Sequence, residues 1–214
     1  AYEIRECLVG SEMCIRDRDY FNGLEDLNNK IVRCVGNSKD RFNEDSLRML
    51  RCIRFASQLN FDMEESTKFN IRELSKNINN VSMERIRDEL CKILVSSQPV
   101  YGIRNIIELN LVDYIIPELK DCVGFEQHNI HHDKDVYGHI LSVVENVPNK
   151  LELRLAALLH DIGKPKCFSI GDNGQGHFYG HQKISADMTK DILKRLKFDN
   201  KTIDKVDKLV YNLS

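Results

Sequence analysis

Apolar residues recur at intervals of three and four along most of the chain after residue 40, which is the spacing of amphipathic helices. In the stretch Phe42–Phe55 four of them fall on one side of a helix. They are Leu47, Met49, Leu50 and Ile53. Asn43 is a favourable N-cap residue, and the two acids after it suit the positive end of a helix dipole. We therefore predict one helix across this stretch, with its apolar side in a core.

Further helical segments show the same periodicity. They are Glu64–Asn77, Ser82–Val95, Val100–Leu111 and Val112–Leu119. The first has its apolar residues at Phe69, Ile71, Leu74 and Ile78, and in the second we expect Ser82 to be the N-cap. A short strand is predicted before them, over Ile31, Val32 and Val35 and ending at Gly36. The fold class expected is therefore mainly α, with a short β segment near the N-terminus.

Two carboxylates and two guanidiniums share the polar side of the first predicted helix: Glu44, Asp45, Arg48 and Arg51. One interpretation is local ion pairing on a solvated face. The other is base recognition, since a carboxylate only accepts hydrogen bonds and a guanidinium only donates them. Cytosine and adenine present an amine beside a ring-nitrogen acceptor, whereas uracil and guanine present a carbonyl beside a ring N–H. A fixed Asp/Arg pair therefore favours C and A.

The run FNEDSLRMLRCIRF resembles the EDxxR motif of the bacterial CCA-adding tRNA nucleotidyltransferase and poly(A) polymerase family. By that resemblance Asp45 and Arg48 read the base edge of CTP and ATP, and Glu44 orients the arginine. The similarity continues through SMERIRDEL (Ser82–Leu90) and IIPEL (Ile115–Leu119). It implies a helical neck and body over residues 39–120, a nucleotide-binding set completed by Arg51, and tRNA as the partner.

All seven histidines lie between positions 128 and 181, which suggests a separate unit over residues 121–214. Its centre, LLHDIGKP, resembles the HD domain, a helical metal-dependent phosphohydrolase fold. The resemblance implies four metal ligands: His139, His160, Asp161 and His181. Imidazole and carboxylate together suit a divalent transition metal or Mg²⁺/Mn²⁺ with an activated water. We expect His128, His131, His132 and His177 to line the same cleft or lie on the surface.

HD domains usually close their site with an aspartate on a late helix. Asp204 and Asp207 are the late candidates here, and the sequence stops soon after them. Either this ligand is missing or the domain is cut short. The glycine-rich run Gly171–Gly180 lacks the Gly-Lys-Ser/Thr of a Walker loop, and we interpret it as a loop over the HD cleft.

The first 18 residues do not fit the rest of the chain. They show neither helical nor strand periodicity for long, and we interpret residues 1–18 as a non-native join without function. Residues 19–38 resemble the last piece of the family's catalytic head. We expect the head carboxylates that hold two Mg²⁺ ions for nucleotidyl transfer to be absent. The chain alone is therefore predicted not to add nucleotides, and CMP or AMP incorporation into tRNA would contradict this.

Composition narrows the class of protein. With 42% hydrophobic and 30% charged residues it is typical of a globular protein, and it shows no apolar run of membrane-spanning length and no signal peptide. Seven singly scattered cysteines favour reduced thiols in the cytoplasm over a disulfide framework or a thiolate zinc site. A net charge of −2 does not by itself indicate nucleic-acid binding, so RNA contacts would need a local basic patch.

These motifs are compatible with three functions. The favoured one is a fragment of a tRNA 3′-end nucleotidyltransferase, with the oligomeric state and the choice between CCA, CC, A and poly(A) addition left open. The second is an HD-type metal-dependent phosphohydrolase, whose phosphate release would be abolished by His160→Ala. The third is a non-catalytic RNA-binding module, whose tRNA affinity would fall steeply with salt.

Overall fold

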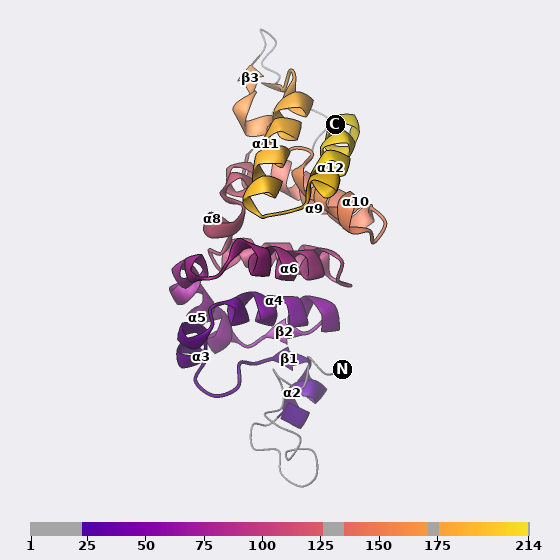
Figure 1. Cartoon of the computed structure of the whole chain (residues 1–214). Coiled ribbons are helices and arrows are strands. Elements are labelled where there is room, and N and C mark those ends of the chain that lie inside the picture. Colours follow the sequence, from indigo (N-terminus) through magenta and orange to yellow (C-terminus); the bar gives the residue numbers. More distant parts are fainter. Residues whose placement is uncertain (1–22, 126–134, 171–175, 214) are drawn as a thin grey trace. The chain divides into compact units, whose positions relative to one another are not determined.

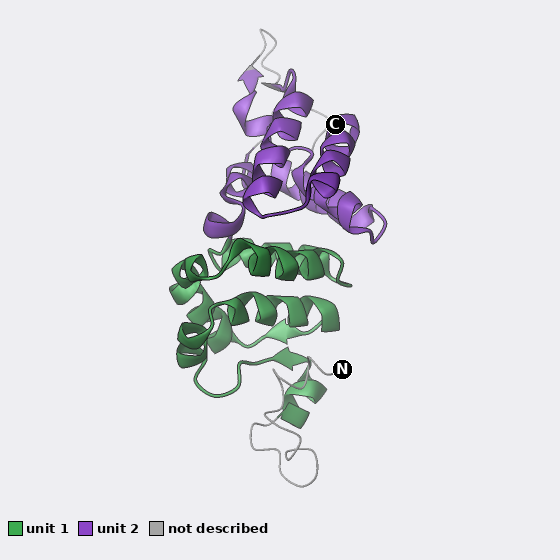
Figure 2. Cartoon of the chain, in the orientation of Figure 1, with its two compact units in different colours: residues 1–111 green, residues 112–214 purple. Residues whose placement is uncertain are grey.

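The described residues, 23–125, 135–170 and 176–213 of a computed structural model, are mainly α-helical, which confirms the predicted fold class (Figure 1). The predictions for residues 1–18 and for His128, His131 and His132 lie outside them. Two pairs of two-residue strands accompany the helices. The chain separates into two units, residues 1–111 and 112–214, so the division falls before the predicted boundary at residue 121 (Figure 2).

The first unit holds six α-helices, one 3₁₀ helix and two strands within its described residues. In chain order they are α2 (Gly23–Asn29), β1 (Ile31–Val32), α3 (Ser38–Glu44), α4 (Leu47–Leu59), β2 (Asp62–Met63), α5 (Glu65–Leu74), η2 (Ser75–Asn80), α6 (Met83–Leu94) and α7 (Pro99–Glu108). The predicted strand near residue 31 is present as β1. Its parallel partner β2 carried no clear sequence signal.

The single helix predicted across Phe42–Phe55 is wrong, because the chain breaks there into α3 and α4. Asp45 has an extended backbone (φ −146°), and its carboxylate accepts the Leu47 N–H at 3.1 Å. The Ser46 hydroxyl donates to the Phe42 carbonyl at 3.0 Å. Both side chains thus compete with the helical hydrogen bonds and reset the helix start. Asn43 is no N-cap, since it lies inside α3.

Helix α4 supplies much of the core of the first unit. Its predicted apolar residues are all buried, and α4 packs against α6, α7 and the β1–β2 pair. Helix α5 ends earlier than predicted, where the chain tightens into η2, and Phe69 is 58% exposed. Ser82 does occupy the N-cap position of α6, although its side chain makes no capping hydrogen bond.

Gly102 allows α7 to approach α4 and α6 closely. A Cβ at this position would collide with Ile93 Cγ2 and lie 2.7 Å from Ser57 Oγ. We predict that Gly102→Ala lowers the free energy of unfolding by about 1–3 kcal/mol through overpacking, despite alanine's higher helix propensity. Urea titration followed by circular dichroism measures this. Arg104→Ala, on an exposed position of α7, is the control and should stay within about 0.5 kcal/mol; equal effects would contradict the prediction.

The second unit is mainly helical, with one antiparallel pair of two-residue strands. Its elements are α8 (Val112–Ile115), η3 (Pro117–Cys122), α9 (Val136–Asn146), α10 (Leu151–Leu159), η4 (Lys164–Lys166), β3 (Ser169–Ile170), β4 (Gly176–His177), α11 (His181–Arg195) and α12 (Asn200–Leu213). The predicted helix Val112–Leu119 is interrupted, since α8 ends before Pro117, which disfavours helical backbone in the preceding residue and lacks an N–H.

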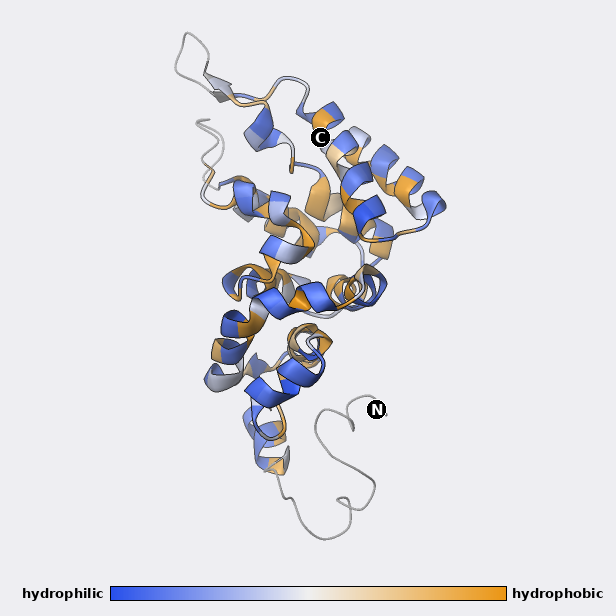
Figure 3. Cartoon of the chain, turned by 60° about the vertical axis from the view of Figure 1, so that its left-hand side comes forward, coloured by the Kyte–Doolittle hydropathy of each residue, from blue (hydrophilic) through white to orange (hydrophobic). Residues whose placement is uncertain are grey.

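Helix α10 is the centre of the second unit. Leu155–Leu159 are all buried, and α10 packs against α9 and α12. The other helices carry hydrophobic and hydrophilic residues alternately along their ribbons, as amphipathic helices do (Figure 3). Across the described residues, no helix combines the length and apolarity that crossing a bilayer would require.

Candidate functional site

In the first unit, Glu44 holds two arginines at the end of α3. Its Oε2 lies 2.8 Å from Arg48 Nη1 on α4 and 3.1 Å from Arg41 Nη1. Hydrogen bonds from these guanidiniums lower the pKa of Glu44. The structure thus brings together Glu44 and Arg48, and it fixes the direction of the Arg48 side chain from the carboxylate before it.

Asp45 lies between α3 and α4, and its two oxygens have different partners. Oδ1 accepts the Leu47 N–H, and Oδ2 pairs with Arg85 Nη2 at 3.0 Å. Partial burial alone would raise the pKa of Asp45, but these partners and the nearby charge of Arg51 lower it. The predicted nucleotide-binding residues therefore lie in one region of the unit, and Asp45 remains an anionic hydrogen-bond acceptor.

The sequence analysis did not assign Arg85 to this site. Arg85 lies in the first turn of α6, forty positions after Asp45, and its side chain is about half exposed. The signal available was the SMERI segment, where Arg85 follows Glu84. Only the packing of α6 beside α4 shows which carboxylate it contacts.

A buried ion pair joins the same two helices. Arg54 Nε on α4 lies 2.7 Å from Glu89 Oε2 on α6, and the two side chains are 4% and 5% exposed. The Arg54 guanidinium also lies over the Phe55 ring, 4.2 Å from its centroid. Because breaking such a pair leaves a buried charge, it holds α6, and with it Arg85, in a defined position relative to α4.

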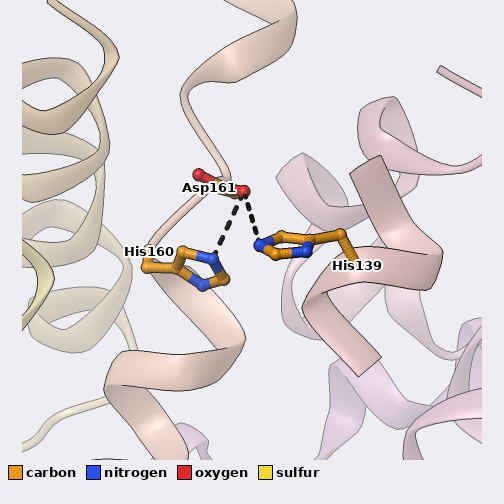
Figure 4. Close-up of side chains that lie close together, drawn as sticks. All are labelled: His139, His160 and Asp161. Carbon is orange, nitrogen blue, oxygen red and sulfur yellow. Dashed lines mark ion pairs between the residues drawn. The ribbon is translucent and has the colours of Figure 1, made fainter. Parts of the chain in front are cut away.

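In the second unit, side chains from three helical segments converge on Asp161. Its Oδ2 lies 3.5 Å from His139 Nε2, 3.2 Å from His160 Nε2 and 2.7 Å from Lys164 Nζ. Figure 4 shows the two imidazole rings, one from α9 and one from the end of α10, directed at the same carboxylate oxygen. One ligand atom from each of His139, His160 and Asp161 lies within 4.8 Å of the others.

His181, at the start of α11, contacts the other carboxylate oxygen of Asp161. Its Nε2 lies 3.6 Å from Asp161 Oδ1. All four residues predicted as metal ligands therefore lie together. The late candidate Asp207 pairs instead with Lys190 at 3.1 Å, and within the described residues neither it nor Asp204 belongs to this cluster.

Backbone contacts orient two of the histidines. His160 Nδ1 lies 2.9 Å from the Ala157 carbonyl, and His181 Nδ1 lies 2.8 Å from the Phe178 carbonyl. A carbonyl can only accept, so each Nδ1 donates to it, and each Nε2 is directed at Asp161, where it becomes a ligand atom when it is unprotonated. Metal-binding histidines are oriented in this way in proteins.

Charge and burial at Asp161 act in opposite directions. Burial alone would raise its pKa, but the adjacent His160 and Lys164 hold the pKa well below its usual range. Asp161 is therefore ionised although its side chain is only 2% exposed. Two imidazoles and one ionised carboxylate form a donor set that fits a divalent transition metal or Mn²⁺.

Gly163, two residues after Asp161, packs closely against α11. The Gly163 N–H donates to Ser185 Oγ on α11 at 3.0 Å. A Cβ on Gly163 would lie 2.8 Å from the Ser185 nitrogen, so only glycine fits without displacing α11. This contact places α11, and hence His181, beside the segment after α10.

Comparison with known proteins agrees with this architecture. Residues 60–123 match the family described as the probable RNA and SrmB-binding site of polymerase A, and residues 129–214 match the HD domain. The A-adding tRNA nucleotidyltransferase of Deinococcus radiodurans is 34% identical over 203 residues, which cover 90% of this chain and 46% of that protein. The chain is therefore similar to tRNA nucleotidyltransferases across its body and HD regions.

Two CCA-adding enzymes are similar to parts of this chain. The CCA-adding enzyme of Limosilactobacillus reuteri is 43% identical over 108 residues, which cover 50% of this chain and 25% of that enzyme. The Thermotoga maritima CCA-adding enzyme, solved in complex with tRNA, matches with a TM-score of 0.52 and 21% identity, over 88% of this chain and 40% of that one. The chain spans less than half the length of these relatives.

Proposed function

We propose that this chain is the nucleotide-reading and RNA-binding part of an enzyme that adds nucleotides to the 3′ end of tRNA. The observation that carries the proposal is the Glu44–Arg48 pair beside the fixed Asp45 carboxylate. It supplies an acceptor for the exocyclic amine of cytosine or adenine and a donor for the adjacent ring nitrogen. Uracil and guanine present a carbonyl and a ring N–H instead, so the same pair does not match them. The tRNA nucleotidyltransferase activity of the relatives and the matched RNA-binding region support tRNA as the partner.

In this proposal each residue has a distinct role. Arg48 donates to the ring-nitrogen acceptor of the base, and Asp45 accepts from its exocyclic amine. Glu44 orients Arg48, and Arg85 and the Leu47 N–H hold the Asp45 carboxylate in place. We assign no nucleotidyl-transfer chemistry to the described residues, which serve base selection and RNA contact.

We predict that the chain binds CTP and ATP about tenfold more tightly than UTP and GTP, and that Asp45→Asn removes this preference. A charge-assisted hydrogen bond contributes roughly 1.5–3 kcal/mol to binding. Because Asp45 is partly exposed, we expect a value near the lower limit, which corresponds to about a tenfold difference in affinity. The asparagine amide can also donate to the carbonyl of uracil or guanine, which lowers the ratio further. Dissociation constants for the four nucleotides, measured by NMR titration, test this.

The matched control is Asp40→Asn, an exposed acid in the first turn of α3. It removes the same charge five residues earlier in the chain and should leave the preference intact. Equal affinities for all four nucleotides in the unmodified chain, or an unchanged preference in Asp45→Asn, would show that these residues form only local ion pairs.

We also infer a second function for the second unit, the metal-dependent hydrolysis of phosphate esters. The observation that favours it is the convergence of His139, His160 and His181 on the ionised Asp161. These residues would hold a divalent transition metal, Mn²⁺ or Mg²⁺. Such an ion supplies an activated water at neutral pH. The neighbouring Lys164 places a positive charge where a phosphate would approach.

A further inference from the structure

In the sequence, His177 at the end of β4 and Tyr179 shortly before α11 stand on either side of Phe178. Phe178 packs inward, with ring centroids 5.5 Å from Phe168 and 6.5 Å from Phe125. The rings of His177 and Tyr179 instead stack on each other, at 5.2 Å between centroids and 14° between planes. Tyr179 is 78% exposed, so its ring gains little from burial and does little for the core.

This stacked pair lies next to the Asp161 cluster in the chain. Tyr179 precedes His181 by two residues, so their Cα atoms are at most about 7 Å apart. Phe178 separates the two stacking residues in the sequence, and its ring centroid lies 5.5 Å from Lys164 Nζ, which itself pairs with Asp161 at 2.7 Å. An exposed aromatic surface and the cluster formed by Asp161, Lys164 and the three histidines are thus neighbours in the second unit.

We propose that His177 and Tyr179 form a stacking platform for the base of a nucleotide whose phosphate occupies the Asp161 cluster. Every nucleobase offers a π face, and stacking on an aromatic side chain is strong without being selective for sequence. The offset His–Tyr stack already presents one flat ring to solvent. The proposal rests on the phosphate-ester activity proposed above and narrows its substrates to nucleotides, either free or at an RNA end.

The reaction assumed is simple hydrolysis, in which water adds across the P–O bond and an alcohol and inorganic phosphate leave. With Mn²⁺ as the added metal, kcat/KM is measured for AMP and for ribose 5-phosphate, which lacks the base. Tyr179→Ala is expected to lower kcat/KM for AMP by about 5- to 100-fold and to leave ribose 5-phosphate unchanged. Tyr179→Phe should retain the AMP activity, and Tyr179→Leu should lose it.

Tyr211→Ala is the matched control, because Tyr211 is also an exposed tyrosine of this unit, on α12. It should leave both substrates unaffected. Equal losses for AMP and ribose 5-phosphate in Tyr179→Ala, or no loss for AMP, would overturn the platform. A short RNA with a 3′-phosphate, assayed beside AMP, identifies which of the two sources depends on Tyr179.

Failure of the underlying activity is distinguishable from failure of the platform. If the unmodified chain hydrolyses neither AMP nor ribose 5-phosphate, the phosphate-ester function is wrong. The platform is then judged by adenosine binding in saturation-transfer NMR, without phosphate or metal. Adenosine binding that persists in Tyr179→Ala, or is absent from the unmodified chain, overturns the platform, whereas binding that disappears only in that variant supports it.

Discussion

Replacing Arg54 by alanine is expected to destabilise the first unit by about 3–5 kcal/mol, since it leaves the buried Glu89 carboxylate with only the longer contact to Lys92, at 3.5 Å. Arg54 and Glu89 join α4 to α6 at 2.7 Å with almost no exposure of either side chain. The chain contains no tryptophan, so unfolding in urea is followed by far-UV circular dichroism. The midpoint should fall by at least about 1 M.

Two further variants separate the ion pair from packing in general. Combining Arg54→Met with Glu89→Leu removes both charges and should recover most of the lost stability, because no charge stays buried. Glu65→Ala breaks a pair of similar length with Lys68 (2.7 Å), but Glu65 is 87% exposed, so the cost should stay below about 1 kcal/mol. An Arg54→Ala effect no larger than this would show that the buried pair contributes little.

His160→Ala is expected to weaken divalent-metal binding by more than about 100-fold, beyond the 10–100-fold typical of changes to outer-shell partners. His160 is 4% exposed, and its Nε2 lies 3.2 Å from Asp161. Calorimetric titration with Mn²⁺ measures the affinity. Thermal unfolding provides a second measure, because saturating metal at 100 times Kd should stabilise the unmodified chain by about 2.7 kcal/mol and the variant hardly at all.

Controls show whether a loss reflects the metal or the fold. Asp161→Asn keeps the shape of the side chain and should lose metal binding while retaining native circular dichroism. His177→Ala removes an imidazole that stacks on Tyr179 rather than facing Asp161, and it should bind metal normally. Metal affinity unchanged in both His160→Ala and Asp161→Asn would contradict the assignment of these residues as ligands.

Local pattern predicted much of the helical content and the apolar side of α4, because burial follows helical periodicity. Within α5 the pattern was less informative, because Phe69 and Ile71 project about 200° apart on a helix, so Ile71 is buried and Phe69 is exposed. The pattern also missed the break at Asp45, where two short polar side chains bind the backbone in place of the helical ladder.

The sequence by itself determined the chemistry available here: an EDxxR run, an adjacent His-Asp pair and histidines confined to the second half. Tertiary structure alone decided which groups meet. Arg85 reaches Asp45 only because α6 packs beside α4, and His139 and His181 reach Asp161 from two other helices. The reason is physical, since helical periodicity specifies which side of a helix is buried but not which neighbour covers it.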